Sequence, residues 1–150
     1  MKNKIIAGAV MVVAIIVAVI LLWPKASKKV SETNPVDSGN AAKLEQTAMR
    51  QYLAGHLRIN IEKFLEFKEA KRNVLPNAKE SITAFYSFLY PPMDINYFLN
   101  DSLSKSKIEF RLAQDESQNR YEVKLNEKQS YAITVPQKGT RATIEYLELK

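Results

Sequence analysis

The segment YEVKLNEKQSYAITVPQKGTRATIEYL (residues 121–147) decides the fold, because apolar and polar residues alternate along three successive runs within it. Strict alternation places the apolar side chains of a β-strand on one face. Polar and turn-forming residues at 126–129 and 136–139 separate the runs. A fourth run of the same period lies at residues 108–112. We therefore predict a four-stranded antiparallel meander with one apolar and one solvated face.

Before these strands, apolar residues recur every three or four positions, as they do in amphipathic helices. This spacing predicts one long helix at residues 41–72 and a second helix at residues 77–90, which Asn77 caps. A short third helix is predicted with Asp94 as its N-terminal cap. Helices followed by a one-faced sheet indicate an α+β domain in which the helices pack on the apolar face of the meander.

An unbroken apolar run extends from Ile5 to Trp23 near the start of the chain. Its 19 residues would span about 29 Å as a helix, which matches a hydrocarbon core of about 30 Å. We predict a transmembrane anchor at residues 5–23, preceded by a short tail at residues 1–4. One face of this helix is rich in small residues and could pack against another helix in lipid, although Ala is also common in membrane helices that do not associate. These residues are Ala7, Ala14 and Ala18.

Two other interpretations of the apolar run are weaker. A cleaved secretory signal usually has a shorter apolar region of about 7–15 residues, and Pro24 stands where a small residue would be wanted before a cut after Ala26. A type IV pilin stem resembles the run in its basic start and in Gly8, but Val13 stands where a pilin carries Glu. We therefore favour an uncleaved anchor.

Residues 24–40 are rich in Ser, Pro, Asn and Lys and predict a flexible tether, which leaves residues 41–150 as the folded body. The net charge of +6 is spread along the chain, and no dense basic patch indicates a nucleic-acid partner. A short N-terminal tail before a first apolar segment usually stays inside, so we expect a cytoplasmic N-terminus and a periplasmic or extracellular body. The flanking lysines slightly favour the reverse orientation, and they suit anionic lipid headgroups. They are Lys25, Lys28 and Lys29.

Signatures of catalysis, cofactor binding and metal binding are missing from the sequence. The chain has one His and no Cys. His56 has no acidic residue within four positions, so we interpret it as a boundary residue of a helix rather than a zinc ligand. Only four Gly occur, and none forms a phosphate-binding loop. We therefore expect no catalytic residue, no cofactor and no metal, and classify the chain as a non-enzyme.

The densest apolar stretch of the body is FYSFLYPPM, residues 85–93. Aromatic residues and Met are enriched at protein interfaces, although packing in the core is the alternative role for them. A second candidate region is the end of the last strand, where alternation breaks and where a partner could add a strand to the sheet. The candidate docking residues of the two regions are Phe88, Tyr90, Met93, Leu147 and Leu149.

The order of anchor, tether, helices and meander is similar in outline to inner-membrane assembly proteins of bacterial secretion, conjugation and pilus machines. The resemblance is to VirB8-like periplasmic domains and to pilus alignment proteins, and it is one of layout without a shared motif. It implies a non-enzymatic, single-pass protein of the bacterial inner membrane that contacts other envelope proteins and the lipid bilayer; self-association is left open. The alternative is a membrane-anchored sensory or binding subunit that holds a small apolar ligand between sheet and helices. The aromatic residues that would line such a cavity are Phe85, Phe98, Phe110, Tyr121, Tyr131 and Tyr146.

Overall fold

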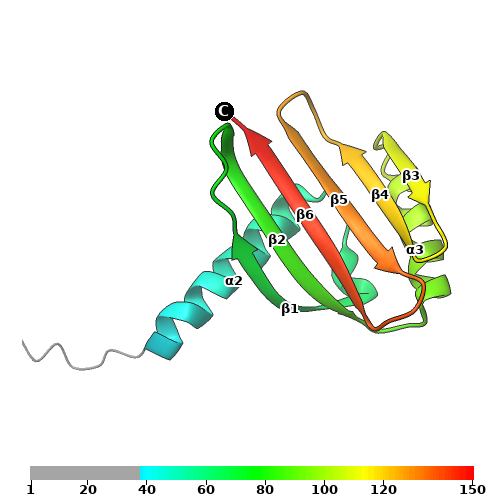
Figure 1. The fold of residues 1–150 in the computed structure, drawn as a ribbon, viewed down its shortest axis with the longest axis horizontal. Helices are drawn as coiled ribbons and strands as arrows, with labels where there is room; N and C mark the ends of the chain where they lie inside the picture. Colours follow the sequence, from blue (N-terminus) through cyan, green and yellow to red (C-terminus); the bar gives the residue numbers. More distant parts are fainter. Residues whose placement is uncertain (1–37) are drawn as a thin grey trace, which may run out of the picture. The chain divides into compact units, whose positions relative to one another are not determined.

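The computed structural model describes residues 38–150 (Figure 1). The predicted tail, the predicted anchor and most of the predicted tether lie outside these residues. Within residues 38–150, no helix combines the length and the hydropathy that crossing a membrane requires. The described elements are α2 (Ser38–His56), the 3-10 turn η1 (Ile61–Lys63), β1 (Leu65–Arg72), β2 (Ala78–Phe88), α3 (Pro92–Lys105), β3 (Phe110–Gln114), β4 (Gln118–Lys124), β5 (Gln129–Pro136) and β6 (Arg141–Leu149).

The six strands form one antiparallel sheet in the order β1-β2-β6-β5-β4-β3 (Figure 1). The four alternating runs of the sequence do form strands, β3 to β6. The last strand, β6, lies inside the sheet, where it pairs with β2 on one side and with β5 on the other. Its backbone is therefore already paired near Leu147 and Leu149, and the expected route of strand addition at this position is closed.

The predicted fold class is wrong in the first half of the domain. The sheet has six strands rather than four, because residues 65–72 and 78–88 form a β-hairpin instead of helices. The predicted second helix does not exist, and the predicted first helix is cut short. The domain keeps helices on the apolar face of a sheet, but the sheet is not a four-stranded meander.

The strand β2 shows why helical spacing misled the prediction. Ile82, Ala84 and Tyr86 are buried, and the residues between them, Thr83 and Phe85, are only half-buried. A period of two therefore coexists in this segment with the three- and four-residue spacing of its largest side chains. Pairing with β1 and β6 on its two sides decides in favour of the strand, because tertiary context overrides local preference in sheets.

The long helix α2 ends at His56 rather than at residue 72. Two residues later, Arg58 has a φ of 56°, the left-handed conformation that commonly terminates a helix. The chain then passes through η1 into β1. The helix-like spacing that continues beyond His56 in the sequence therefore belongs to a turn and an edge strand.

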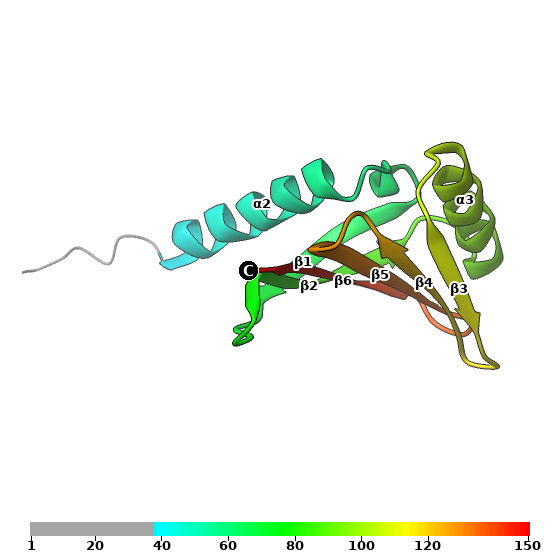
Figure 2. The same ribbon diagram turned by 90° about the horizontal axis from the view of Figure 1, so that it is seen from above.

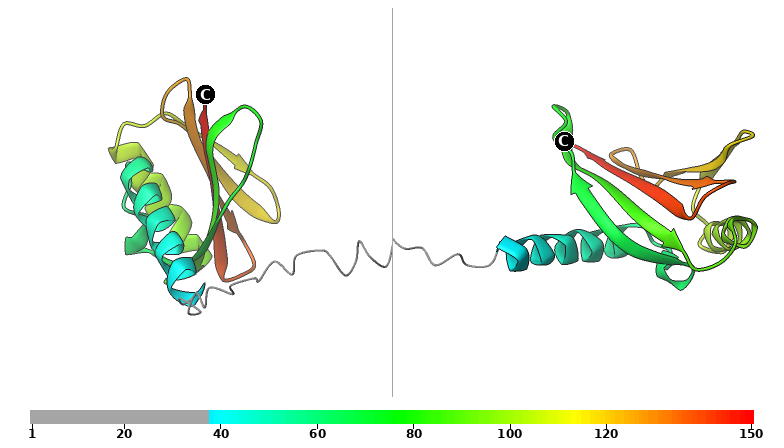
Figure 3. Two further views of the ribbon diagram at one scale, coloured as in Figure 1. Left: turned by 90° about the vertical axis from the view of Figure 1, so that its left-hand side faces the viewer. Right: turned by 60° about the horizontal axis from the view of Figure 1, so that its bottom comes forward.

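Both helices lie on the same face of the sheet (Figures 2 and 3). The short third helix of the prediction is present as α3, although Pro91 occupies its cap position and Asp94 lies in its first turn. Proline suits the first helical position, here Pro92, because the N–H that it lacks would be unpaired there. Each aliphatic side chain buried between helices and sheet contributes about 1.5–3 kcal/mol. The fully buried ones include Leu53, Leu57, Ile82, Ile95, Leu99, Leu103, Ile133 and Ile144.

Candidate functional site

Four large apolar side chains are exposed in the segment where β2 leads into α3. Met93 is 80 % exposed, Tyr97 70 %, Leu89 50 % and Tyr90 46 %. Met93 and Tyr97 are four residues apart on α3 and therefore share one helical face. We call these four residues the apolar patch.

The apolar patch is held by aromatic packing beneath it. The rings of Tyr90 and Tyr97 both contact Phe98, with centroid distances of 5.4 Å and 5.9 Å. Phe98 in turn stacks on the buried Phe64 at 5.9 Å. The N–H of Leu89 donates to the carbonyl oxygen of Phe64 at 3.1 Å. Tyr90 and Tyr97 therefore pack on a ring that is itself packed on the core, and the backbone of Leu89 is joined to Phe64.

One acidic side chain beside the patch, Asp94, has no ion pair within residues 38–150. It follows Met93 directly in the sequence. One helical turn beyond Tyr97, Asp101 accepts a 2.8 Å hydrogen bond from the ammonium of Lys105. A complementary surface would therefore combine apolar side chains with a basic group next to Asp94.

The predicted docking residues divide between exposed and buried positions. Tyr90 and Met93 belong to the apolar patch, whereas Phe88 is half-buried and packs against the core. Leu149 is 39 % exposed and Leu147 is half-buried, and both line a groove on the face of the sheet that the helices leave free. The two regions do not form one surface.

Sequence reasoning missed two members of the apolar patch. Leu89 lies within the predicted second helix, which the structure does not contain, and neither Leu89 nor Tyr97 is among the predicted docking residues. The available signal for Tyr97 was its position four residues after Met93 within the predicted third helix. Tyr97 lies outside the buried set of α3, which consists of Ile95, Leu99 and Leu103.

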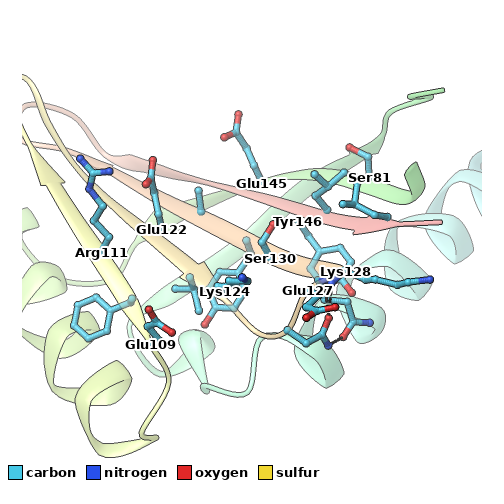
Figure 4. Close-up of a pocket in the computed structure, with 18 of the residues that line it drawn as sticks. Ser81, Glu109, Arg111, Glu122, Lys124, Glu127, Lys128, Ser130, Glu145 and Tyr146 are labelled. Carbon is cyan, nitrogen blue, oxygen red and sulfur yellow. Dashed lines mark hydrogen bonds between the residues drawn. The ribbon is translucent and has the colours of Figure 1, made fainter. Parts of the chain in front are cut away.

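A groove of about 770 Å³ runs over the face of the sheet that the helices leave free (Figure 4). Arg111, Glu122 and Glu145 project into it from β3, β4 and β6 (Figure 4). Arg120 also lines the groove, and its guanidinium contacts Glu145 at 2.7 Å and Glu122 at 3.5 Å. Acidic and basic side chains alternate along the groove, so it does not select strongly for one sign of charge. Its apolar end is formed by Leu75, Leu147 and Leu149.

The aromatic residues expected to line an apolar ligand cavity mostly fill the core. Tyr121, Tyr131 and Tyr146 are between 1 % and 3 % exposed. The hydroxyl of Tyr131 donates to the carbonyl oxygen of Leu57 at 2.8 Å, which ties β5 to the end of α2. The hydroxyl of Tyr121 lies 3.0 Å from Oδ1 of Asn96 on α3, and burial raises the pKa of Tyr121 to about 12. These tyrosines connect helices to sheet.

The single histidine, His56, hydrogen-bonds to and stacks on Tyr52, one turn earlier in α2. Nδ1 of His56 lies 2.7 Å from the carbonyl oxygen of Tyr52, so this nitrogen is the donor, and the two rings stack at 4.0 Å. Within residues 38–150, no group of three or more His, Cys, Asp or Glu side chains is arranged to hold a metal ion.

Asp115 lies in the β3–β4 turn, where hydrogen bonds from Ser117 lower the pKa of its carboxyl group.

Comparison with known proteins adds no relative: no family model, no curated protein and no solved structure matches this chain.

Proposed function

We propose that this chain is a non-enzymatic, membrane-anchored component of a bacterial envelope machine of the secretion, conjugation or pilus type. Its folded domain binds another envelope protein through the apolar patch. The single observation that carries this proposal is the exposure of four large apolar side chains, Leu89, Tyr90, Met93 and Tyr97, in one short segment in which two of them pack on Phe98. Aromatic residues and Met are enriched in the buried centres of protein interfaces.

The shape of the apolar patch favours a protein partner over a small ligand. Small ligands bind in concave sites that surround most of their surface, but no residue of the patch lines either the groove on the sheet or the smaller pocket beside Arg58. Large apolar side chains that are exposed near one another are typical of a protein contact. The partner is inferred to carry an apolar segment with a basic residue placed to meet Asp94.

The predicted anchor supports the same proposal. An anchor at residues 5–23 would confine the domain to one membrane, and confinement raises the effective concentration of a partner in that membrane. In the proposed orientation the N-terminus is cytoplasmic and the domain is periplasmic or extracellular. The alternative of a small apolar ligand between sheet and helices has weaker support, because tyrosine side chains occupy that region.

Site-specific photocrosslinking of the full chain in native membranes tests the proposal. A photoreactive residue replaces Met93 or Tyr97 in the patch, and Val74 provides the control because it is apolar, 97 % exposed and located in the β1–β2 turn. We expect the same protein adduct from Met93 and Tyr97 and none of it from Val74. In addition, Tyr97→Asp should abolish the adduct formed at position 93, because a buried charge opposes docking.

Two outcomes would contradict the proposal. Adducts that are equally strong at Val74 would show that crosslinking reports general exposure. Adducts with lipid alone at Met93 and Tyr97 would show that the patch contacts the bilayer rather than a protein. Leu44→Asp, at an exposed position of α2, is the matched charge control and should leave the adduct unchanged.

A further inference from the structure

The two edges of the sheet differ in how they are protected. On the edge strand β1, the side-chain amide of Gln46 hydrogen-bonds both backbone groups of Ala70, at 2.9 Å and 2.7 Å. A register shift between Phe67 and Glu69 further interrupts this strand. Bulges and covering side chains are devices that keep an edge strand from pairing with another chain. The β1 edge is therefore closed.

The opposite edge strand, β3, forms its backbone hydrogen bonds to β4 through every second residue. The carbonyl oxygen of Glu109 accepts from the N–H of Lys124 at 3.4 Å, and the N–H of Asp115 donates to the carbonyl oxygen of Gln118 at 3.0 Å. Hydrogen-bonded and non-hydrogen-bonded pairs alternate in an antiparallel ladder. The odd-numbered residues of β3 therefore direct their backbone groups toward β4.

It follows that the N–H and C=O groups of Phe110, Leu112 and Gln114 point away from the sheet. Within residues 38–150, β3 pairs with β4 alone, and Figure 1 shows it at the margin of the sheet with no strand beyond it. The side chain of Leu112 is 43 % exposed. This edge has neither Pro nor a register shift to block pairing.

The geometry points to a second copy of this chain as the occupant of the open edge, with the two β3 strands pairing antiparallel about a two-fold axis at Ala113. In this register Arg111 of each copy lies opposite Asp115 of the other, so the symmetry creates two ion pairs. A register centred on Leu112 would instead place Glu109 opposite Asp115. Opposite charges directly across strands stabilise a sheet and like charges destabilise it, so charge selects the first register.

The side chains at this edge suit that pairing. Arg111 has no ion pair within the described part of the chain. Asp115 accepts its three hydrogen bonds from Ser117 and Gln118 through Oδ1, which leaves Oδ2 available. Ala113 would meet its symmetry mate in a non-hydrogen-bonded pair, where Cα atoms approach to about 4.5 Å and a small side chain fits. This contact goes beyond the proposed function, because it uses a surface separate from the apolar patch.

Disulfide trapping of the full chain in its membrane tests the inference. The chain contains no cysteine, so Ala113→Cys introduces a single thiol at the two-fold axis. Mild oxidation should yield a disulfide-linked dimer several-fold more efficiently than Lys71→Cys, the matched control on the protected β1 edge. Combining Ala113→Cys with Arg111→Glu should reduce the yield several-fold, because the two ion pairs become repulsive, whereas Arg111→Lys should preserve it.

A dimer yield for Ala113→Cys no greater than that of Lys71→Cys would overturn the inference. A yield that is insensitive to Arg111→Glu would overturn the register. Tyr97→Asp in the Ala113→Cys background separates this contact from the proposed function: the dimer should persist when the apolar patch is disabled. Loss of the dimer in that variant would show that association depends on the patch and would contradict pairing through β3.

Discussion

The side-chain amide of Gln46 on α2 hydrogen-bonds both backbone groups of Ala70 on β1. Its Nε2 donates to the carbonyl oxygen at 2.9 Å, and its Oε1 accepts from the N–H at 2.7 Å. One side chain thus satisfies the same two groups that a neighbouring strand would satisfy. It joins the first helix to the edge of the sheet and ends the sheet at that edge.

Replacing Gln46 with Ala should destabilise the domain by about 1–3 kcal/mol, because a backbone N–H and a C=O lose their partners at a partly buried position. Urea unfolding of the purified protein measures the change. Thr47→Ala, which removes only an exposed hydrogen bond within α2, is the control and should change stability by less than about 0.5 kcal/mol. Equal effects of the two substitutions would refute the role given to Gln46.

Stability should fall at acidic pH through Glu148. Its hydrogen bond from Lys79, and next its hydrogen bond from Tyr52, lower the pKa of this carboxyl group below the ordinary value of 4.5. A carboxyl pKa that is depressed in the folded state gives stability that is present above the unfolded pKa and is lost as the pH falls through the folded pKa. Unfolding free energies of Glu148→Gln and the parent, measured from pH 7 to pH 2, should converge at the acidic end. A constant difference across this range would contradict the prediction.

At alkaline pH the stability should decrease through Tyr121. Burial raises the pKa of its hydroxyl from 10.0 to about 12. A folded-state pKa above the unfolded value gives stability that is complete below the unfolded pKa and is lost as the pH rises between the two values. Tyr121→Phe should therefore weaken the fall in unfolding free energy between pH 10 and pH 12, which chemical denaturation at several pH values would measure. An unchanged slope would show that Tyr121 ionises alike in both states.

Two leucines of α2 provide a matched pair for the packing of the core. Leu53 is fully buried against the sheet, whereas Leu44 is 71 % exposed. Leu53→Ala should destabilise the domain by about 2–5 kcal/mol through lost burial and the cavity left behind. Leu44→Ala should have almost no effect, because Ala and Leu are both good helix formers. Thermal unfolding distinguishes the two, and comparable losses would contradict the orientation of α2.

Strands were predictable where apolar and polar residues alternate regularly, as in β4, and were missed where the alternation is irregular, as in β2. In β4, Tyr121 and Val123 are buried while Glu122 and Lys124 are exposed, so polarity alone marks the two faces. In β2 the outward positions include Phe85, and the pattern no longer separates the faces. Local spacing then favours a helix. Only the backbone pairing of β2 with its two neighbours resolves the choice.

The docking surface was predictable only in part. Tyr90 and Met93 were predictable because they belong to the densest apolar stretch of the body, and aromatic residues and Met are enriched at interfaces. Phe88 is a predicted docking residue but packs against the core, whereas Leu89, which is not among the predicted docking residues, is exposed. Which of these side chains is buried depends on the path of the chain from the end of β2 into α3. Tertiary packing sets that path.

By itself the sequence determined the alternating strands β3 to β6, the buried stripe of α3 and an apolar segment long enough to span a membrane, because each is a local periodicity or a local run. Only the tertiary structure decided that residues 65–88 form a hairpin, that β6 lies in the interior of the sheet and that β3 is left as an open edge. It also decided which aromatic residues gather in the apolar patch. These features depend on pairings between residues far apart in the chain, and the free energy of such pairings is not contained in any short window of sequence.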